Sequence, residues 1–359
     1  MIKFLDLQKL NQPFETQFLS KTKEFLDKGW YILGNEVKQF EQSFAQYSNA
    51  KHCIGVGNGL DALVLILKAY IQLGNLQKGD EVIVPANTYI ASVLAILQAD
   101  LVPVFVEPNI ETYNINPDLI EEKITSKTKA ILLVHLYGQL AEMDAIIELS
   151  NQNNLLIIED AAQAHGLPFK GSHARAFSFY PGKNLGALGD GGAITTDDDT
   201  LAEVLFSLRN YGSNKKYHND FIGVNSRLDE LQAAFLSIKL PSLNERNEAR
   251  QKVAKRYLAE IKNSKIVLPT CDNFDKHVFH LFVIRTENRD DLQEYLFKNG
   301  IETIIHYPIP PHKQKALSDF NQLSLPITEK IHQEVLSLPM SSVLSEDEIS
   351  NIITTLNCY

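Results

Sequence analysis

Lys183 and Asp160 are the two residues of this chain whose types and surroundings point most directly to chemistry. Lys183 lies in the glycine-rich stretch Ser178-Phe-Tyr-Pro-Gly-Lys-Asn-Leu-Gly-Ala-Leu-Gly-Asp-Gly-Gly, and Asp160 closes an apolar run that begins at Leu155. A lysine amine forms Schiff bases with carbonyl compounds, and an acid placed against a pyridine nitrogen lets pyridoxal phosphate (PLP) act as an electron sink. A lone lysine is usually a solvated loop residue, but a carboxylate at the end of a buried strand needs a cationic partner. The pair therefore predicts a PLP enzyme, while a purely structural Asp160 remains the alternative.

A phosphate site is expected where Gly55-Val-Gly-Asn-Gly-Leu-Asp follows a short strand and opens a helix. Backbone N–H groups at the positive end of a helix can hold a phosphate. The dinucleotide fingerprint would need a third glycine at 60 or 62, where Leu60 and Ala62 stand. The alternative is a glycine-rich turn without a ligand, just as Ser178 is either a turn hydroxyl or a phosphate contact. Tyr89 either stacks on a flat ring or packs in the core.

A P-loop with Asp160 as a magnesium ligand is the rival interpretation of the lysine stretch. Asn184 follows Lys183 where that motif needs Ser or Thr, and Phe177 stands in place of its first glycine. The sequence therefore does not support a P-loop.

The densest positive cluster near the lysine stretch is Arg209-Asn-Tyr-Gly-Ser-Asn-Lys-Lys-Tyr, which includes Lys215, Lys216 and Tyr217. Such a cluster is usually a solvated loop, yet it is the best candidate to meet a diphosphate. His306-Tyr-Pro-Ile-Pro-Pro-His312 offers two imidazoles and the phenol of Tyr307, without the spacing of metal ligands, so no metal site is expected.

Composition limits the classes of partner. The net charge of −10, from 44 acidic and 34 basic residues, argues against general affinity for nucleic acid or anionic membrane. Three distant cysteines without CxxC spacing predict neither a disulfide framework nor a zinc site, and fit a reducing cytoplasm. The start has no signal-peptide core and no run reaches the length of a membrane span. We expect a cytoplasmic protein with no nucleic-acid or membrane partner.

From Lys51 the chain alternates short apolar strands with helices, which predicts a mostly parallel sheet covered on both faces, with ligands at the carboxyl ends of the strands. The phenylalanines at 14, 18, 25, 40 and 44 are expected to face a core. We predict a large α/β domain over residues 1–242 and a smaller α+β domain over 243–359. The expected helices cover residues 59–72, 89–99, 117–124, 142–153, 227–240, 243–263, 289–299 and 327–337.

These motifs, in this order, resemble the DegT/StrS-type nucleotide-sugar aminotransferases, from Phe4-Leu-Asp-Leu to near the C-terminus. The family has PLP fold type I, the fold of aspartate aminotransferase. Four stretches look most like those of enzymes that aminate C3 of dTDP-3-keto-6-deoxyhexoses: Asn58-Gly-Leu-Asp-Ala-Leu, Asn87-Thr-Tyr-Ile-Ala-Ser, the lysine stretch and His306-Tyr-Pro-Ile-Pro. One departure from the family is the stretch at 167–176, which is several residues shorter than the family's usual loop. The length of this loop bears on the shape of the cleft wall.

The resemblance implies roles for individual residues. Lys183 would bond to the cofactor aldehyde, Asp160 would face the pyridine nitrogen, Gln163 would bind the ring oxygen and Tyr89 would stack on the ring. The phosphate would be held by Gly59, Leu60, Ser178 and Asn225, the last from the neighbouring subunit of a homodimer. The expected substrate contacts are Tyr180, Lys215, Lys216, Tyr217, His306 and Tyr307.

The function that follows is transfer of an amino group from an amino acid, L-glutamate in the family, to C3 of a dTDP-3-keto-6-deoxyhexose, with pyridoxamine phosphate (PMP) as the intermediate cofactor form. The product, a dTDP-3-amino-3,6-dideoxyhexose, would serve glycan, O-antigen or lipopolysaccharide biosynthesis. The alternatives are a 4-keto nucleotide sugar as substrate and a non-catalytic PLP-binding regulator. Family dehydratases carry histidine in place of the lysine, so Lys183 argues against a dehydratase.

Overall fold

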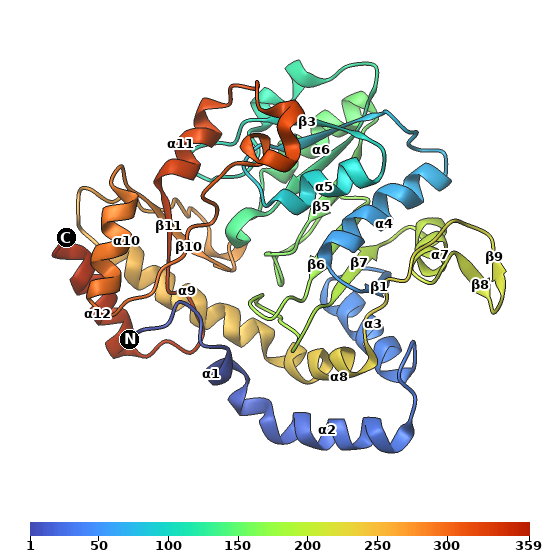
Figure 1. The fold of residues 1–359 in the computed structure, drawn as a ribbon, viewed down its shortest axis with the longest axis horizontal. Helices are drawn as coiled ribbons and strands as arrows, with labels where there is room; N and C mark the ends of the chain where they lie inside the picture. The colour runs from blue at the N-terminus through green and yellow to red at the C-terminus, as the bar shows by residue number, and fades with distance from the viewer.

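The computed structural model describes residues 1–359, and its centre is a seven-stranded sheet in the order β1-β7-β6-β5-β4-β2-β3 (Figure 1). Neighbouring strands from β3 to β6 pair in parallel, and only β7 is antiparallel to both of its neighbours. The prediction of a mostly parallel sheet is confirmed. The strands are β1 His52–Val56, β2 Glu81–Pro85, β3 Val102–Val106, β4 Thr128–Val134, β5 Leu156–Asp160, β6 Ala174–Ser178 and β7 Gly192–Thr196.

Both faces of the sheet are buried because alternate strand residues enter different hydrophobic clusters. In β4, Ala130, Leu132 and Val134 pack with helices α4, α5 and α7, whereas Ile131 and Leu133 pack on the opposite face with α6. Near β1, β6 and β7 that second face is covered by α3 and α8. The helices of this part are α1 Leu7–Asn11, α2 Glu15–Lys28, α3 Asn35–Tyr47, α4 Gly59–Gln72, α5 Ile90–Gln98, α6 Met143–Asn153, α7 Asp199–Leu208 and α8 Glu230–Lys239.

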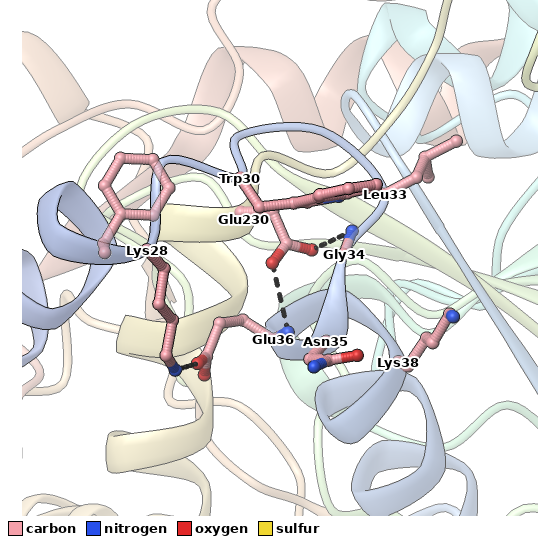
Figure 2. Close-up of a pocket in the computed structure, with 9 residues that line it drawn as sticks. Lys28, Trp30, Leu33, Gly34, Asn35, Glu36, Lys38 and Glu230 are labelled. Carbon is pink, nitrogen blue, oxygen red and sulfur yellow. Dashed lines mark hydrogen bonds and ion pairs between the residues drawn. The ribbon is translucent and has the colours of Figure 1, made fainter.

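Residues 2–50 are mainly helical, as expected. Phe18, Phe40 and Phe44 are buried, while Phe14 and Phe25 are half-buried. The carboxylate of Glu230, on α8, caps the N-terminus of α3. It accepts hydrogen bonds from the N–H groups of Gly34, Glu36 and Val37 at 2.6, 3.1 and 3.0 Å. This contact forms one wall of a cavity of about 390 Å³ whose other walls include Lys28 and Trp30 (Figure 2). The cavity does not include any residue of the lysine stretch.

The C-terminal part continues from the long helix α9 into a two-stranded antiparallel sheet, with its own hydrophobic cluster of 19 buried residues. Ile2 belongs to that cluster and bridges to Ile301, so the first residues of the chain pack against this part. The boundary between 242 and 243 remains a prediction. The elements are α9 Leu243–Glu260, β10 Phe282–Arg285, α10 Arg289–Lys298, α11 Pro326–Glu334, β11 Val335–Leu338 and α12 Glu346–Asn357.

Two expected helices are wrong in whole or in part. Residues 117–124 form two short 3-10 turns, Pro117–Leu119 and Glu121–Lys123, because a segment this short does not sustain an α-helix by itself. The helix expected at 327–337 ends at Glu334, and the apolar residues of β11 pair with β10 instead. None of the helices combines the length and apolar character that crossing a bilayer requires.

Candidate active site

The candidate site lies where the carboxyl ends of β5 and β6 meet the loop that carries Lys183. Asp160 is the last residue of β5, Ser178 is the last residue of β6, and Lys183 follows five residues after Ser178. The carboxyl ends of parallel strands share one edge of a sheet, so this topology brings the two predicted catalytic residues to one place. The electrostatic influence that Lys183 and Asp160 exert on each other's pKa agrees with that placement.

Asp160 is held as a buried acceptor, with only 7% of its surface exposed. Its Oδ2 accepts from the Ser92 hydroxyl at 2.8 Å, and its Oδ1 accepts from the N–H of Ala162 at 3.1 Å. Burial raises the pKa of Asp160, while these hydrogen bonds and the charge of Lys183 oppose that rise. A protonated pyridinium is the kind of partner that such a carboxylate favours.

Lys183 is half-buried and lines the cleft. Burial of its ammonium lowers the pKa of Lys183 to about 8, and Asp160 opposes part of that shift. An amine with this pKa is partly neutral near physiological pH, so it can both take and give a proton.

Gln163 and Tyr307 form one wall of the site. Gln163 Nε2 donates to the Tyr307 hydroxyl at 3.1 Å, and its Oε1 accepts from the N–H of Tyr137 at 2.6 Å. The ring of Tyr89 lies 5.2 Å from that of Tyr307, centroid to centroid. Tyr89 is 54% exposed, which rules out the core-packing alternative and leaves its ring free on one side for a flat ligand.

The expected phosphate site is a narrow cradle between α4 and β6. Asn58 caps α4: its side-chain Oδ1 accepts from the N–H of Asp61, and its backbone carbonyl accepts from the N–H of Ala62. The first two N–H groups of the helix, those of Gly59 and Leu60, have no acceptor within it. A Cβ added at Gly59 would lie 2.7 Å from Cβ of Ser178. Glycine is therefore required for the helix start to lie directly beside the Ser178 side chain.

The cleft itself is a cavity of about 430 Å³, and three of the predicted substrate contacts, Tyr180, His306 and Tyr307, line it together with Lys183 and Gln163. Burial, with a smaller contribution from the charge of Lys183, lowers the pKa of His306 to about 4, so this imidazole is neutral at physiological pH. No residue of the shortened 167–176 stretch lines the cavity. Leu167 and Phe169 pack instead in the hydrophobic cluster that also contains residues of α3.

The other predicted site residues do not line this cavity; they are the cofactor residues Gly59, Leu60, Tyr89, Asp160, Ser178 and Asn225 and the substrate contacts Lys215, Lys216 and Tyr217. Lys215, Lys216 and Tyr217 are exposed on a hairpin of β8 (Ser213–Lys215) and β9 (His218–Asn219), which projects from the fold (Figure 1). Asn225 is also exposed, while its neighbour Ser226 is buried against Gly57. Asn225 and the hairpin residues are therefore not part of the cleft that Lys183 lines in this chain.

A buried ion network lies one residue before Asp160. Glu159 accepts from His135 Nε2 at 2.5 Å and from Arg175 Nε at 3.0 Å, and His135 Nδ1 accepts from the N–H of Ala141 at 3.1 Å. His135 is thus a satisfied core residue. Burial favours the neutral form of Glu159, but the hydrogen bond from His135 and the charge of Arg175 outweigh it and hold the pKa of Glu159 below its usual value.

Two residues of the site were not predicted from the sequence: Ser92, which contacts the catalytic carboxylate from α5, and Arg250, which lines the cleft from α9. The motif Asn87-Thr-Tyr-Ile-Ala-Ser contained Ser92, but nothing in the motif indicates which strand end that hydroxyl faces. The chain has no group of three or more His, Cys, Asp or Glu side chains placed to hold a metal ion.

Together these residues fit PLP on structural grounds. The helix start beside Ser178 suits a phosphate, the buried Asp160 suits a ring nitrogen, and Lys183 suits an aldehyde carbon. The aromatic wall at Tyr89 suits a flat ring.

Comparison with known proteins agrees with this fit. The model of the DegT/DnrJ/EryC1/StrS aminotransferase family matches residues 14–357. The dTDP-3-amino-3,6-dideoxy-alpha-D-galactopyranose transaminase of Aneurinibacillus thermoaerophilus is 56% identical, with 100% of this chain and 99% of that protein covered. DesV of S. venezuelae, solved in complex with a ketimine intermediate, is similar with a TM-score of 0.95 and 44% identity over 99% of this chain and 97% of that one. NtdA of Bacillus subtilis, solved with bound cofactor PMP, is similar with a TM-score of 0.92 and 35% identity over 98% of this chain and 83% of that one.

Proposed function

This chain belongs to the DegT/DnrJ/EryC1/StrS aminotransferase family and is a PLP-dependent sugar aminotransferase, and from that premise we propose its substrates. The proposed reaction transfers the amino group of L-glutamate to C3 of a dTDP-3-keto-6-deoxyhexose and gives a dTDP-3-amino-3,6-dideoxyhexose. The 56% identity to a transaminase named for that product, over the whole of both chains, carries the proposal.

Different residues of the site would hold different parts of the cofactor. Gly59, Leu60 and Ser178 would hold its phosphate, and Asp160 would hold the ring nitrogen protonated. Bound PLP supplies an electron sink for the carbanion that forms at the reacting carbon. The buried carboxylate of Asp160 keeps that sink effective because its negative charge favours the protonated ring.

Lys183 moves the protons of both halves of the reaction. In the first half, neutral Lys183 Nζ would take the proton from the α-carbon of the amino-acid donor and pass it to the cofactor carbon C4′. In the second half, it would take a proton from C4′ and deliver it to C3 of the sugar. A single flexible amine can serve both positions because the two substrates occupy the same cleft in turn. Tyr180, His306 and Tyr307 line that cleft and would orient the sugar.

We further propose that the enzyme works as a cytoplasmic homodimer whose product serves glycan or lipopolysaccharide assembly. Large apolar side chains stay exposed on the single chain, among them Trp30 at 66%, Tyr217 at 87% and Ile222 at 93%. Exposed apolar surface of this kind is typical of a contact with another protein. A second copy would cover it and would bring Asn225 and the β8–β9 hairpin to the neighbouring site. The three cysteines are free, which suits a reducing compartment.

The experiment that tests the substrate is incubation of the purified holoenzyme with L-glutamate and a panel of 3-keto and 4-keto dTDP-sugars, with each product identified by NMR. Amination at C3 of a 6-deoxyhexose is the expected result, and amination of the 4-keto sugars alone would replace the proposal with its alternative. Lys183→Ala is the control. It should retain less than about a thousandth of the activity, as expected for a removed proton-transfer group, and borohydride should no longer fix the cofactor to the chain.

A further inference from the structure

Arg250 is a buried cation that has no acidic partner in this chain. It lies on α9, with 3% of its surface exposed, and its Nη1 donates to the carbonyl oxygens of Phe279, His280 and Met340 at 3.3, 3.3 and 2.9 Å. Burial, followed by the charge of Arg246, lowers the pKa of Arg250 to about 9, and no carboxylate opposes that shift. A buried charge that lacks a counter-ion is costly, so this guanidinium suits an anion that the chain itself does not supply.

Two donor groups of Arg250, which lines the cleft, have no partner within the chain. A guanidinium carries five N–H donors, but Nε and Nη2 make no hydrogen bond within the chain, and neither atom is sealed from the surrounding space. Arg250 and Lys183 both line the cleft of about 430 Å³ and a second cavity of about 10 Å³ beneath the lysine loop. The smaller cavity is near the lower limit for one water molecule, so only the cleft can admit a substrate.

The other charged groups near the cleft are not available to bind an anion beside Lys183. Lys239 and Arg246 line only the smaller cavity, and Lys239 is already bound to Asn11 and to the carbonyl of Gly186. Glu302 is the one acidic side chain that lines the cleft, and its Oε2 accepts from the N–H of Phe4 at 3.1 Å. Arg250 is therefore the buried guanidinium available to an anion beside Lys183.

The chemistry of the two substrates, taken from the proposed function, identifies the anion. In an amino acid the carboxylate is bonded directly to the carbon that reacts. In a dTDP-linked 6-deoxyhexose the ring is neutral, and the diphosphate on C1 is separated from the reacting C3 by another ring carbon. A cation deep in the cleft, beside the lysine, therefore matches the amino acid and not the sugar.

We propose that Arg250 binds a carboxylate of the amino-acid donor through its Nε and Nη2 groups. Two parallel charge-assisted hydrogen bonds would fix the donor in the cleft. Arg250 is then a binding residue for the donor half of the reaction, and the sugar half does not depend on it.

The test is Arg250→Gln in the holoenzyme, with the affinity for glutarate measured by calorimetry. Glutarate is a dicarboxylate without an amine, so it reports binding without reaction. We expect its affinity to fall about tenfold or more, the scale of a lost charge-assisted pair, with a matching rise in KM for glutamate and an affinity for dTDP within about twofold of native. Arg256→Gln is the matched control because Arg256 lies on the same helix, is paired with Glu260 and Glu346, and does not line the cleft.

A folded Arg250→Gln protein that binds glutarate as tightly as the native enzyme would overturn the proposal. A loss of dTDP affinity as large as the loss of glutarate affinity would also overturn it, because such a loss indicates general collapse of the cleft. If Arg250→Gln does not fold, Arg250→Lys replaces it, because lysine keeps the charge but cannot form the bidentate pair of hydrogen bonds. An Arg250→Lys enzyme with native glutarate affinity would then count against the proposal. Loss of activity with glutamate but not alanine assigns the γ-carboxylate, and equal loss assigns the α-carboxylate. A native enzyme that reacts with no amino acid at all would instead refute the proposed function, whatever glutarate shows.

Discussion

The hydroxyl of Ser92 donates a hydrogen bond of 2.8 Å to Oδ2 of Asp160, and both side chains are buried. Thr88 Oγ1 lies 2.9 Å from the same hydroxyl oxygen. An ionised carboxylate only accepts and a serine has one O–H, so Thr88 must donate to Ser92, which donates to Asp160. This relay stabilises the charged form of the acid against the effect of burial.

Ser92→Ala should therefore slow amino transfer while the cofactor stays bound. Removing one hydrogen bond to a charged group costs about 1.5–3 kcal/mol, which would raise the pKa of Asp160 and lower kcat about tenfold or more. The measurement is kcat from pH 6 to 9, beside the amount of cofactor that the purified variant retains. Thr88→Val, which leaves the Ser92–Asp160 bond in place, should have a smaller effect. A Ser92→Ala enzyme with native kcat across that range would show that the hydrogen bond does not tune the acid.

The pH dependence of the donor half-reaction should follow the amine of Lys183. Only the neutral amine can take a proton, and burial lowers the pKa of Lys183 to about 8, so the rate should rise as the pH increases through about 8 and then level off. An ordinary lysine, with a pKa of about 10.4, would keep the rate rising well beyond pH 9. Stopped-flow absorbance of the cofactor with excess glutamate gives the profile. A plateau already present at pH 6.5 would contradict the assignment of this step to Lys183.

Gly59→Ala should weaken both the fold around the phosphate cradle and the retention of the cofactor. Its new Cβ would lie 2.7 Å from Cβ of Ser178, a distance that real Cβ contacts do not show, so the helix start must shift. We expect a lower Tm and a weaker PLP affinity, measured by thermal unfolding and by titration of the apoenzyme. In the double variant Gly59→Ala/Ser178→Gly the opposing Cβ is absent, so part of the lost Tm should return. A double variant less stable than both single variants would rule out this contact as the cause.

Most of the site on the sheet was predictable because local pattern and topology agree there. Asp160 and Ser178 end apolar strands, and α4 begins at Gly59, directly after the capping residue Asn58, with the bounds that the sequence predicts. Parallel strands then bring those ends together whatever the loops contain.

Contacts made by side chains from distant elements were not predictable in this way. Ser92 is 68 residues before Asp160, and its place on α5 is fixed by how that helix packs on the sheet. Arg250 lies in a helix whose sequence is mostly polar and charged, so the burial of one guanidinium depends on the C-terminal part that covers it. Similarly, the end of α11 was misjudged because the pairing of β11 with β10 is a long-range interaction.

Glu159→Gln should destabilise the fold without a direct effect on chemistry. Glu159 is fully buried between His135 and Arg175, and removing one charge of such a network leaves the other uncompensated, at a cost of about 3–5 kcal/mol. Folding lowers the pKa of Glu159. Its contribution to the free energy of unfolding is therefore complete above the pKa of the unfolded state, about 4.3, and is lost as the pH falls through the pKa of the folded state. Urea unfolding at pH 7 should reveal the difference, and it should shrink at acid pH. Equal stabilities of variant and native protein at pH 7 would contradict this account of the network.

Asn225 provides the sharpest test of whether two chains build one active site. Lys183→Ala should be inactive, and Asn225→Ala should be weakly active at limiting PLP because a phosphate contact is lost. If Asn225 serves the neighbouring subunit, a mixed dimer of the two variants contains one site with both native residues, so mixing after mild dissociation should restore activity beyond the sum of the separate proteins. If Asn225 serves its own chain, no site in the mixed dimer has both residues and mixing restores nothing. The control is the mixture of Lys183→Ala with Asp160→Asn, two variants of the same site on each chain, in which every site keeps a defect and no recovery is expected.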